Sequence, residues 1–273
     1  MIASTIRVVA QKIRHAPGLR GCTSVWNLIR HPYFRLLKLL AGSEGISIRL
    51  AGHHLKLDPC FATQSWEATE TESYRAFVSE IHSGDVVYDV GAQIGTYAIL
   101  AVQCSAPNGR AVAYEPMDGS RKFLNLHLRL NQAENRVVVR SFCCGSEPGT
   151  ARLYHDAGKI DGDCSLVPRS GSEHSDIKLV TLDSEVRELG LIPSVIKIDV
   201  EGWEWEVLKG ARRTLERYRP CLFLSLHPPV LTELGVSDGA VLSWLEELGY
   251  KWQTIARDHE VHVLAKWAGE RRV

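Results

Sequence analysis

Residues 86–97, VVYDVGAQIGTY, decide the fold. The apolar run that ends at Asp89 is typical of a buried strand, and from Thr96 onward the apolar residues recur at helical spacing. Between them, Gly91 and Gly95 indicate a tight bend, because glycine lets the backbone turn sharply and approach a ligand at the N-terminus of the helix. The stretch therefore predicts a strand, a glycine bend and a helix. A bend that binds no ligand is the alternative.

Two features narrow the kind of ligand. The G-x-x-x-G spacing differs from the G-x-G-x-x-G fingerprint of dinucleotide sites, and the bend lacks the lysine of a P-loop. The carboxylate of Asp89, just before the first glycine, suits an amine better than a phosphate. Glu115 follows the next predicted strand about twenty residues later, where an acid accepts hydrogen bonds from both hydroxyls of a ribose. These residues favour S-adenosylmethionine (SAM) over a nicotinamide or a nucleoside triphosphate.

The composition is that of an ordinary globular protein. Of 273 residues, 45% are apolar and 23% are charged, and the formal net charge is zero, which does not favour nucleic-acid binding. The seven cysteines form no C-x-x-C pair, so we expect reduced thiols in a cytoplasmic protein and no structural zinc. No apolar stretch approaches the roughly 18 residues of a membrane span.

The start of the chain differs from the rest in its charge. We expect residues 1–66 to be an accessory segment of helices and a β-hairpin, ahead of a main domain over residues 67–273. The first forty residues carry seven basic side chains and no acid. Because basic residues interrupt the apolar positions, we expect no signal peptide. The segment either packs on the main domain or places residues 1–40 against an anionic membrane or a lipid-linked substrate.

Within this segment, residues 2–15 and 25–40 have helical apolar spacing. Residues 46–50 and 55–57 flank a turn, as in a β-hairpin. The paired histidines in that turn have no third ligand nearby in the sequence, so we expect them to be solvated.

Beyond residue 86, predicted strands and helices alternate, which is typical of a parallel sheet covered on both faces. Further strands are expected at 111–114, 137–140, 177–182, 195–200, 221–226, 251–255 and 261–265, and helices at 66–80, 118–131, 203–215 and 238–248. We expect the third strand to run towards Cys143 and Cys144, and residues 145–176 to form an inserted hairpin or a mobile loop. Asp183 is a candidate helix cap. The fold class is therefore α/β, with a sheet that has helices on both faces.

Polar side chains end four of the predicted strands. They are Asp89, Glu115, Asp199 with Glu201, and His227. In an open α/β sheet, ligands bind beyond the carboxyl ends of the strands, at the topological switch point. Any one of these acids could instead cap a helix, but four such ends on one rim indicate a site.

Several stretches match the motifs of a known family in order. VVYDVGAQIGTYA resembles the first motif of the FkbM-type SAM-dependent methyltransferases, AYEP the second, and VIKIDVEGWEWEVLKGARRTL the most diagnostic one. VTLDSEV and LHPP are similar to further blocks of that family. Two residues depart from the pattern: Gln93 stands where the family usually has Asn, and Ser225 where many members have Glu.

The resemblance implies a Rossmann-like, class I methyltransferase fold with a mostly parallel seven-stranded sheet. It also implies transfer of the SAM methyl group, mostly to oxygen on sugars or secondary metabolites. The expected cofactor-binding residues are Asp89, Gly91, Gln93, Gly95, Thr96, Glu115, Pro116 and Ser165. A sugar hydroxyl is hard to deprotonate, so the transfer needs a general base or a metal. We expect Asp199 nearest the reacting centre, His227 as the base or the residue that orients it, and Glu201 as a further catalytic candidate. No metal is expected, although these three residues could instead bind Mg²⁺.

Other functions remain open at this stage. The chain could be a non-catalytic adenosine-ligand binder or a scaffold that retains the fold, since Gln93 and Ser225 depart from the pattern. A nicotinamide oxidoreductase is disfavoured by the missing fingerprint, and nucleic-acid methylation by the lack of a base-flipping motif. The expected partner is a small-molecule or glycan-type acceptor, and a homo-oligomer is conceivable.

Overall fold

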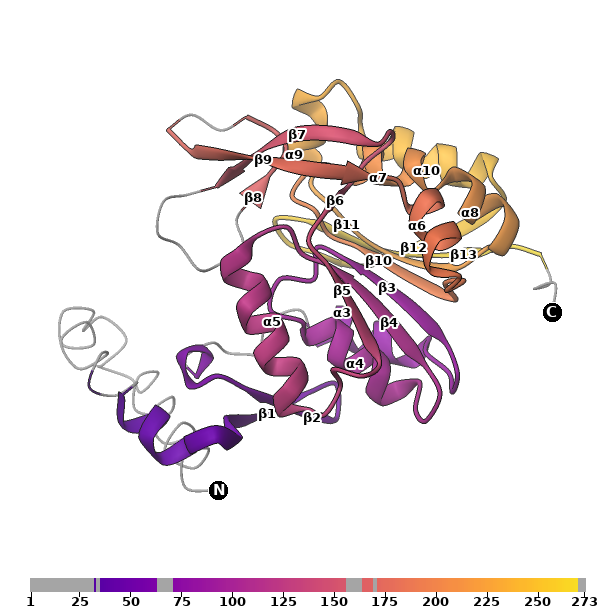
Figure 1. Ribbon diagram of the computed structural model, residues 1–273. Coiled ribbons are helices and arrows are strands. Elements are labelled where there is room, and N and C mark those ends of the chain that lie inside the picture. Colours follow the sequence, from indigo (N-terminus) through magenta and orange to yellow (C-terminus); the bar gives the residue numbers. More distant parts are fainter. Residues whose placement is uncertain (1–31, 33–34, 63–70, 156–163, 169–170, 270–273) are drawn as a thin grey trace, which may run out of the picture.

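The computed structural model describes residues 32, 35–62, 71–155, 164–168 and 171–269 (Figure 1). Seven strands form its central sheet, in the spatial order β12 (Tyr250–Arg257), β13 (Val261–Trp267), β11 (Cys221–Leu226), β10 (Val195–Ile198), β3 (Val86–Val90), β4 (Arg110–Tyr114) and β5 (Val137–Arg140). Strand β13 is antiparallel to both of its neighbours, and the remaining neighbours pair in parallel. This confirms the predicted Rossmann-like, mostly parallel seven-stranded sheet.

The order of the strands creates a switch point. The chain enters the sheet at β3 and moves outward through β4 to β5, and later returns to the other side of β3 at β10. The carboxyl ends of β3 and β10 therefore lie side by side where the direction of winding reverses, which is the usual ligand site of such sheets.

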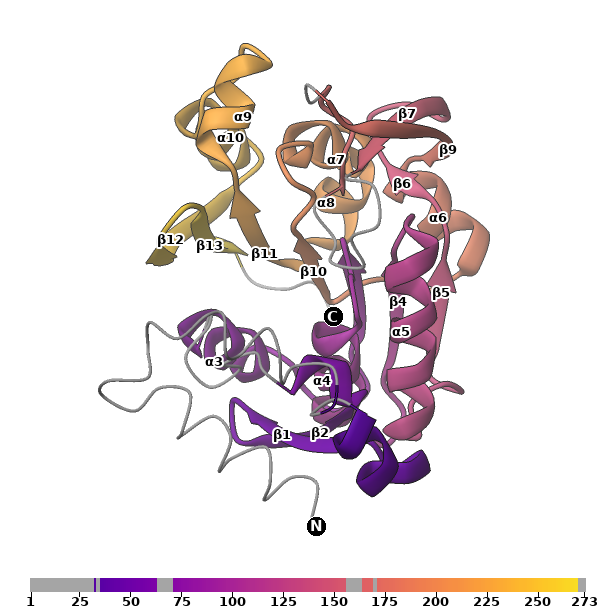
Figure 2. The same ribbon diagram turned by 90° about the vertical axis from the view of Figure 1, so that its left-hand side faces the viewer.

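Side chains of the sheet alternate between two hydrophobic cores, as the period of two in a strand requires. Val87 belongs to one core and Tyr88 to the other. Helices α3 (Thr71–Ser79), α4 (Thr96–Cys104) and α5 (Asp118–Leu130) cover the first core. The second core is covered by α6 (Leu182–Leu189), α7 (Glu204–Gly210), α8 (Arg212–Tyr218), α9 (Pro228–Glu233) and α10 (Asp238–Glu247) (Figure 2). Helices thus lie on both faces, as predicted.

The predicted hairpin near the start of the chain is present. Strands β1 (Ile46–Leu50) and β2 (His53–Leu57) pair antiparallel between the 3₁₀ turns η1 (Gly42–Glu44) and η2 (Pro59–Phe61). Leu55 and Leu57 are fully buried in the same core as α4 and α5. The division of the chain at residue 66 remains a prediction.

Much of the rest of that segment lies outside the described residues, including the helix expected over 2–15 and most of the one over 25–40. Residues 35–41 are helical. Leu36 and Leu39 on this helix are exposed, by 47% and 80%. The predicted contact of residues 1–40 with a membrane stays a prediction.

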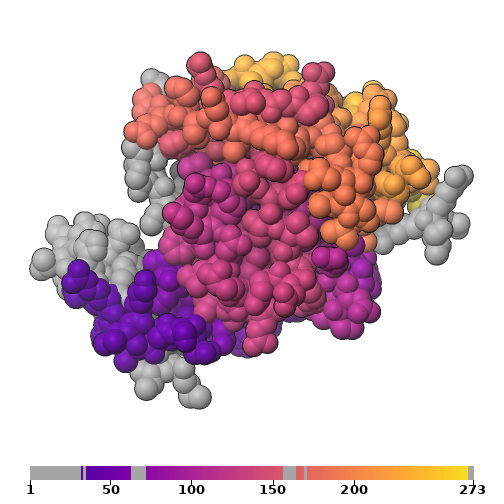
Figure 3. Space-filling view, viewed as in Figure 1, coloured from indigo at the N-terminus to yellow at the C-terminus, as the bar shows by residue number. Residues whose placement is uncertain are grey.

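A second, smaller sheet lies across one edge of the molecule (Figure 3, salmon). Its strands, in spatial order, are β6 (Cys143–Cys144), β9 (Glu173–Val180), β7 (Gly149–His155) and β8 (Cys164–Ser165). The antiparallel pair of β7 and β9 confirms the inserted hairpin, and the strand predicted over 177–182 is the end of β9. Strand β5, the third strand of the main sheet in chain order, stops at Arg140. The prediction that this strand continues towards Cys143 and Cys144 was therefore wrong. These cysteines pair with β9 instead.

Two local predictions were also wrong. Thr181 rather than Asp183 caps α6, because the Thr181 hydroxyl accepts the backbone N–H of Ser184 at 3.1 Å. Asp183 instead accepts the backbone N–H groups of Arg213 and Thr214, at the start of α8. The single helix expected over 203–215 is two helices, because the chain breaks at Gly210 and Ala211. A Cβ atom on Gly210 would lie 1.9 Å from the carbonyl oxygen of Gly145, so only glycine lets α7 end this close to the loop after β6.

Two observations bear on the predicted environment of the protein. Among the described residues, no helix is both long and apolar enough to cross a membrane. No disulfide joins any two of the six cysteines in the described ranges.

Candidate active site

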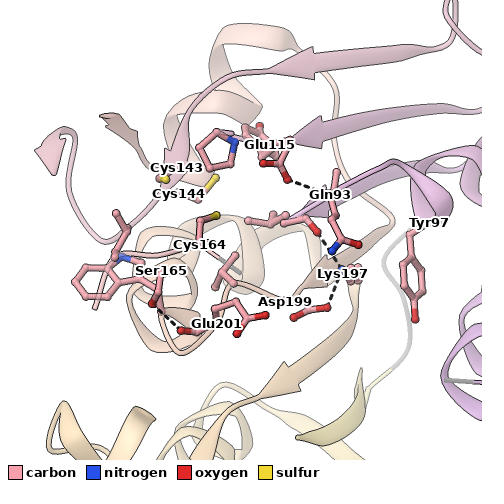
Figure 4. A pocket seen from close by; sticks show the side chains of 18 of the residues that line it. Gln93, Tyr97, Glu115, Cys143, Cys144, Cys164, Ser165, Lys197, Asp199 and Glu201 are labelled. Atoms are coloured by element: carbon pink, nitrogen blue, oxygen red, sulfur yellow. Dashed lines mark hydrogen bonds and ion pairs between the residues drawn. The ribbon is translucent and has the colours of Figure 1, made fainter. Parts of the chain in front are cut away.

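A cleft lies at the carboxyl ends of β3, β4 and β10, at the switch point of the sheet (Figure 4). It encloses about 1010 Å³ of space, including its open mouth. Among the predicted site residues, those that line it are Gly91, Gln93, Thr96, Glu115, Pro116, Ser165, Asp199 and Glu201. Asp89, Gly95 and His227 are not among the lining residues.

The glycine bend is held by its neighbours on both sides. Gly91 has a φ of 85°, and a Cβ atom there would lie 1.8 Å from the carbonyl oxygen of Asp199. The backbone N–H groups of Gly91 and Ala92 both donate to the carbonyl of Tyr114, at 3.1 and 2.9 Å. Gly95, with a φ of 88°, is the N-cap residue of α4. The bend thus lies between the ends of β4 and β10, and at Gly91 a residue larger than glycine would not fit.

Glu115 is a buried carboxylate whose oxygens are both oriented by the backbone. Its Oε2 accepts the N–H of Gln93 and its Oε1 accepts the N–H of Met117, each at 2.8 Å. The side chain lines the cleft although the residue is only 3% exposed. Burial raises the pKa of Glu115 to about 7, against the opposing effect of the two N–H donors. Because a carboxylate oxygen can accept more than one hydrogen bond, Glu115 can still accept from a ligand.

Lys197, which was not among the predicted site residues, links two of the predicted acids. It lies in the middle of β10, and its Nζ is 3.7 Å from Oδ1 of Asp89 and 3.2 Å from Oδ2 of Asp199. Asp89 is fully buried, and neither of its oxygens has a hydrogen bond in the described part of the chain. Burial raises the pKa of Asp89, while the Lys197 ammonium acts in the opposite direction. Asp89 is not among the residues that line the cleft, whereas Asp199 lies on its wall (Figure 4).

Beyond β10, the chain turns sharply around a buried acid. Glu201 and Gly202 have φ values of 55° and 99°. Oε1 of Glu204, a residue with no exposed surface, accepts the N–H of Gly202 at 2.9 Å. The same oxygen lies 2.9 Å from Nδ1 of His227, the residue that follows β11. Glu204 therefore fixes both the turn and the orientation of the imidazole.

The other nitrogen of His227 faces two further acids. Its Nε2 is 3.7 Å from Oε2 of Glu201 and 3.4 Å from Oε1 of Glu260, which lies in the turn between β12 and β13 and lines the cleft. Burial alone would lower the pKa of His227, but the carboxylates of Glu204 and Glu260 raise it well above its ordinary value. His227 itself lies behind the cleft wall.

Ser165 connects the small sheet to the turn after β10. Its hydroxyl donates to the carbonyl of Glu201 at 2.9 Å and accepts the N–H of Val167 at 3.1 Å (Figure 4). The residue lines the cleft next to Cys164. Because its hydroxyl already has two partners, Ser165 serves first to hold the wall of the cleft together.

Comparison with known proteins identifies the family. Residues 89–252, more than half of the chain, match the family model described as the methyltransferase FkbM domain. The chain belongs to this family. The match begins at Asp89 and includes the glycine bend, Glu115, and the turn that follows β10.

Individual proteins are similar to parts of the chain. The chain is 32% identical over 149 residues to the hexuronic acid methyltransferase AglP of Haloferax volcanii, an alignment that covers 54% of this chain and 58% of the relative. It is 26% identical over 164 residues to the methyltransferase sdnD of Sordaria araneosa, covering 49% of this chain and 62% of the relative. The chain thus spans less than two thirds of the length of these relatives. A crystal structure of methyltransferase FkbM from Methylobacillus flagellatus KT matches 67% of this chain and 44% of its own, at 20% identity and a TM-score of 0.48.

Three residues of the site were missed from the sequence: Lys197 and Glu204, which lie within the matched FkbM domain, and Glu260, which follows it. Lys197 carried a signal, because it is a lone lysine inside an otherwise apolar strand. Glu204 lies in a run of alternating acids and tryptophans, where nothing marks it as the buried one. Glu260 is 33 residues from His227 in the sequence, and only the pairing of β11 with β13 brings the two together.

Proposed function

We propose that this FkbM-type domain is a SAM-dependent methyltransferase that methylates a hydroxyl of a sugar, a glycolipid or a secondary metabolite. The observation that carries the proposal is Glu115, a backbone-oriented carboxylate on the wall of a cleft at the switch point of the sheet. The choice of a sugar acceptor is supported by the relative described as a hexuronic acid methyltransferase.

The residues around the cleft fit SAM. Glu115 has both oxygens directed by N–H donors, an arrangement that suits the two adjacent hydroxyls of a ribose. The backbone of the bend from Gly91 to Thr96 lies next to this carboxylate and would hold the rest of the nucleoside, together with Pro116. When bound, SAM supplies a methyl group on a positively charged sulfur, which a nucleophilic oxygen can take.

On the acceptor side, the structure favours carboxylates over the histidine for direct contact. Asp199 and Glu260 line the cleft, whereas His227 lies behind it with its Nδ1 against Glu204. We therefore assign the contact with the acceptor hydroxyl to Asp199 and Glu260, and a positioning role to His227. Glu201, also on the wall, shapes the same region.

The test is transfer of a labelled methyl group from SAM to glycan and small-molecule extract fractions, with uronic acid sugars as the first defined acceptors. We expect an alkali-stable O-methyl product, and a fall in kcat of about 10²-fold or more in Asp199→Asn. Glu233→Gln, which removes an exposed carboxylate on α9, is the control and should retain the wild-type rate. If SAM binds but no fraction accepts the methyl group, the proposed activity is wrong, and the result favours a non-catalytic binder or scaffold.

A further inference from the structure

We propose that Asp199, His227 and Glu260 bind a divalent cation at the edge of the cleft. One donor atom from each of these residues lies within 4.8 Å of the donor atoms of the other two. The three residues come from separate segments: the end of β10, the end of β11 and the turn between β12 and β13. The site itself does not depend on the proposed methyl transfer.

Strand pairing explains why these segments meet. In the antiparallel pair of β11 and β13, Leu226 lies opposite Val261. The next residue on one strand, His227, therefore meets the preceding residue on the other, Glu260. Asp199 directly follows β10, the other neighbour of β11. The cluster is thus built into the register of the sheet rather than formed by mobile surface side chains.

His227 has the arrangement of a metal-binding histidine. It is 6% exposed, and its Nδ1 lies 2.9 Å from the fully buried carboxylate of Glu204. Its Nε2 has no hydrogen-bond partner in the described part of the chain, although it points at Glu260. A carboxylate behind one ring nitrogen orients the ring and raises the basicity of the other nitrogen towards a metal.

The spacing also fits a bound ion. The distance of 3.4 Å from Nε2 to Oε1 of Glu260 is too long for a good hydrogen bond. Two ligands that each lie about 2.1 Å from an octahedral ion are separated by roughly 3.0 Å when adjacent and roughly 4.2 Å when opposite. Small side-chain movements would therefore convert the present separations into coordination distances.

Charge favours a cation at this position. The carboxylates of Asp199, Glu201, Glu204 and Glu260 gather around one lysine and one histidine. With His227 protonated, the group still has an excess of two negative charges, and a cation that binds Nε2 would displace the proton held there. The exposed His259 also contacts Oε1 of Glu260, at 3.0 Å. Two carboxylates and one imidazole suit Mg²⁺ or Mn²⁺ better than Ca²⁺, which takes six to eight oxygen ligands.

This site revises the Mg²⁺ alternative considered from the sequence, because Glu260 takes the place of Glu201. Three protein ligands leave positions of an octahedron open, and Asp199 and Glu260 both line the cleft. An acceptor hydroxyl could occupy an open position, where the cation would lower its pKa. This consequence, unlike the site, rests on the proposed function.

The experiment is a titration of the metal-free full-length protein with Mn²⁺, in which the signal of free Mn²⁺ is followed by electron paramagnetic resonance. We expect one Mn²⁺ per chain, displaced by Mg²⁺. Glu260→Gln and His227→Asn should each weaken binding at least about tenfold, and Glu204→Gln should weaken it by about 10- to 100-fold by releasing the imidazole. Glu233→Gln on α9 should bind as the wild type does.

Two results would overturn the site. One is the absence of a stoichiometric Mn²⁺ site tighter than about 1 mM in the wild type. The other is equal Mn²⁺ affinity in Glu260→Gln and the control, with circular dichroism showing both folded. Because this titration contains no SAM, its failure is distinct from a failure of the proposed methyl transfer.

Discussion

The buried carboxylate of Glu115 predicts how ligand binding depends on pH. Its pKa is raised to about 7 by burial, and the ionised form is the stronger hydrogen-bond acceptor on both oxygens. SAM affinity should therefore rise as the pH rises through 7, by about tenfold between pH 6 and pH 8. Calorimetric titrations at pH 6, 7 and 8 measure this, and a pH-independent affinity in the wild type would contradict it. In Glu115→Gln the dependence should flatten.

The same pKa has a consequence for folding. The pKa of Glu115 is higher in the folded protein than its ordinary value of 4.5, so the folded state binds the proton more tightly. The stabilisation from this group is complete below about pH 4.5 and is lost as the pH rises through about 7. In urea unfolding of the ligand-free protein, Glu115→Gln should therefore lose less stability than the wild type between pH 5 and pH 8. If the stabilities of the wild type and Glu115→Gln depend on pH in the same way, the pKa of Glu115 is not raised.

Lys197 is the second residue whose charge the site depends on. Its ammonium lies near the fully buried carboxylate of Asp89. Lys197→Met should lower the free energy of unfolding by about 3 kcal/mol at pH 8, because it leaves a buried charge without its partner. Adding Asp89→Asn should restore much of the loss. Lys209→Met, which removes a half-exposed lysine paired with Glu206, should cost less than about 1 kcal/mol. Equal losses in the two lysine variants, measured in urea, would refute this role.

At the scale of elements, the bend between β3 and α4 depends on Gly91. Its φ of 85° is unfavourable for other residues, and a Cβ atom would collide with the carbonyl oxygen of Asp199. Gly91→Ala should destabilise the protein by more than about 2 kcal/mol and weaken SAM binding, as measured by urea unfolding and calorimetry. The matched control is Gly119→Ala in α5, where a Cβ atom would meet nothing within 4 Å. It should stabilise the protein by roughly 0.5 kcal/mol, and a similar effect at both glycines would contradict the argument.

The elements also show what local sequence can predict. The strands of the main sheet and helices α5 and α10 follow from apolar periodicity, because their burial repeats along a few adjacent residues. Which groups Asp183 binds and where α7 ends depend instead on distant contacts. Asp183 is used by α8, and Gly210 packs against Gly145. Such contacts between segments far apart in the chain leave little trace in local patterns.

At the scale of the whole molecule, the hairpin of β1 and β2 and the central sheet share one hydrophobic core. Leu55 of β2 has no exposed surface and belongs to the cluster that includes α4 and α5. Leu55→Ala should therefore cost about 2–5 kcal/mol and keep a single unfolding transition, seen alike by circular dichroism and tryptophan fluorescence. If β1 and β2 instead form a unit independent of the main domain, the two probes should report separate transitions.

The candidate site also depends on contacts between distant segments, which local sequence does not predict. Glu115, Asp199 and the glycine bend were predictable because each follows a recognisable strand, and the sheet gathers strand ends at one rim. Glu204 and Glu260 were not, since their place at His227 depends on the turn after β10 and on the register of β11 with β13. Asp89, a predicted cofactor-binding residue, is fully buried and does not line the cleft, but it lies 3.7 Å from the ammonium of Lys197, which does.

The central claim is that the cleft binds SAM through Glu115. Calorimetric titration of the wild type with SAM and S-adenosylhomocysteine, beside Glu115→Ala, tests it most directly. We expect micromolar binding that weakens roughly ten- to hundredfold in the variant, through the loss of charge-assisted hydrogen bonds. Glu134→Ala, which removes an exposed acid after α5, should bind as the wild type does. No binding in the wild type, or equal binding in Glu115→Ala, would contradict the claim.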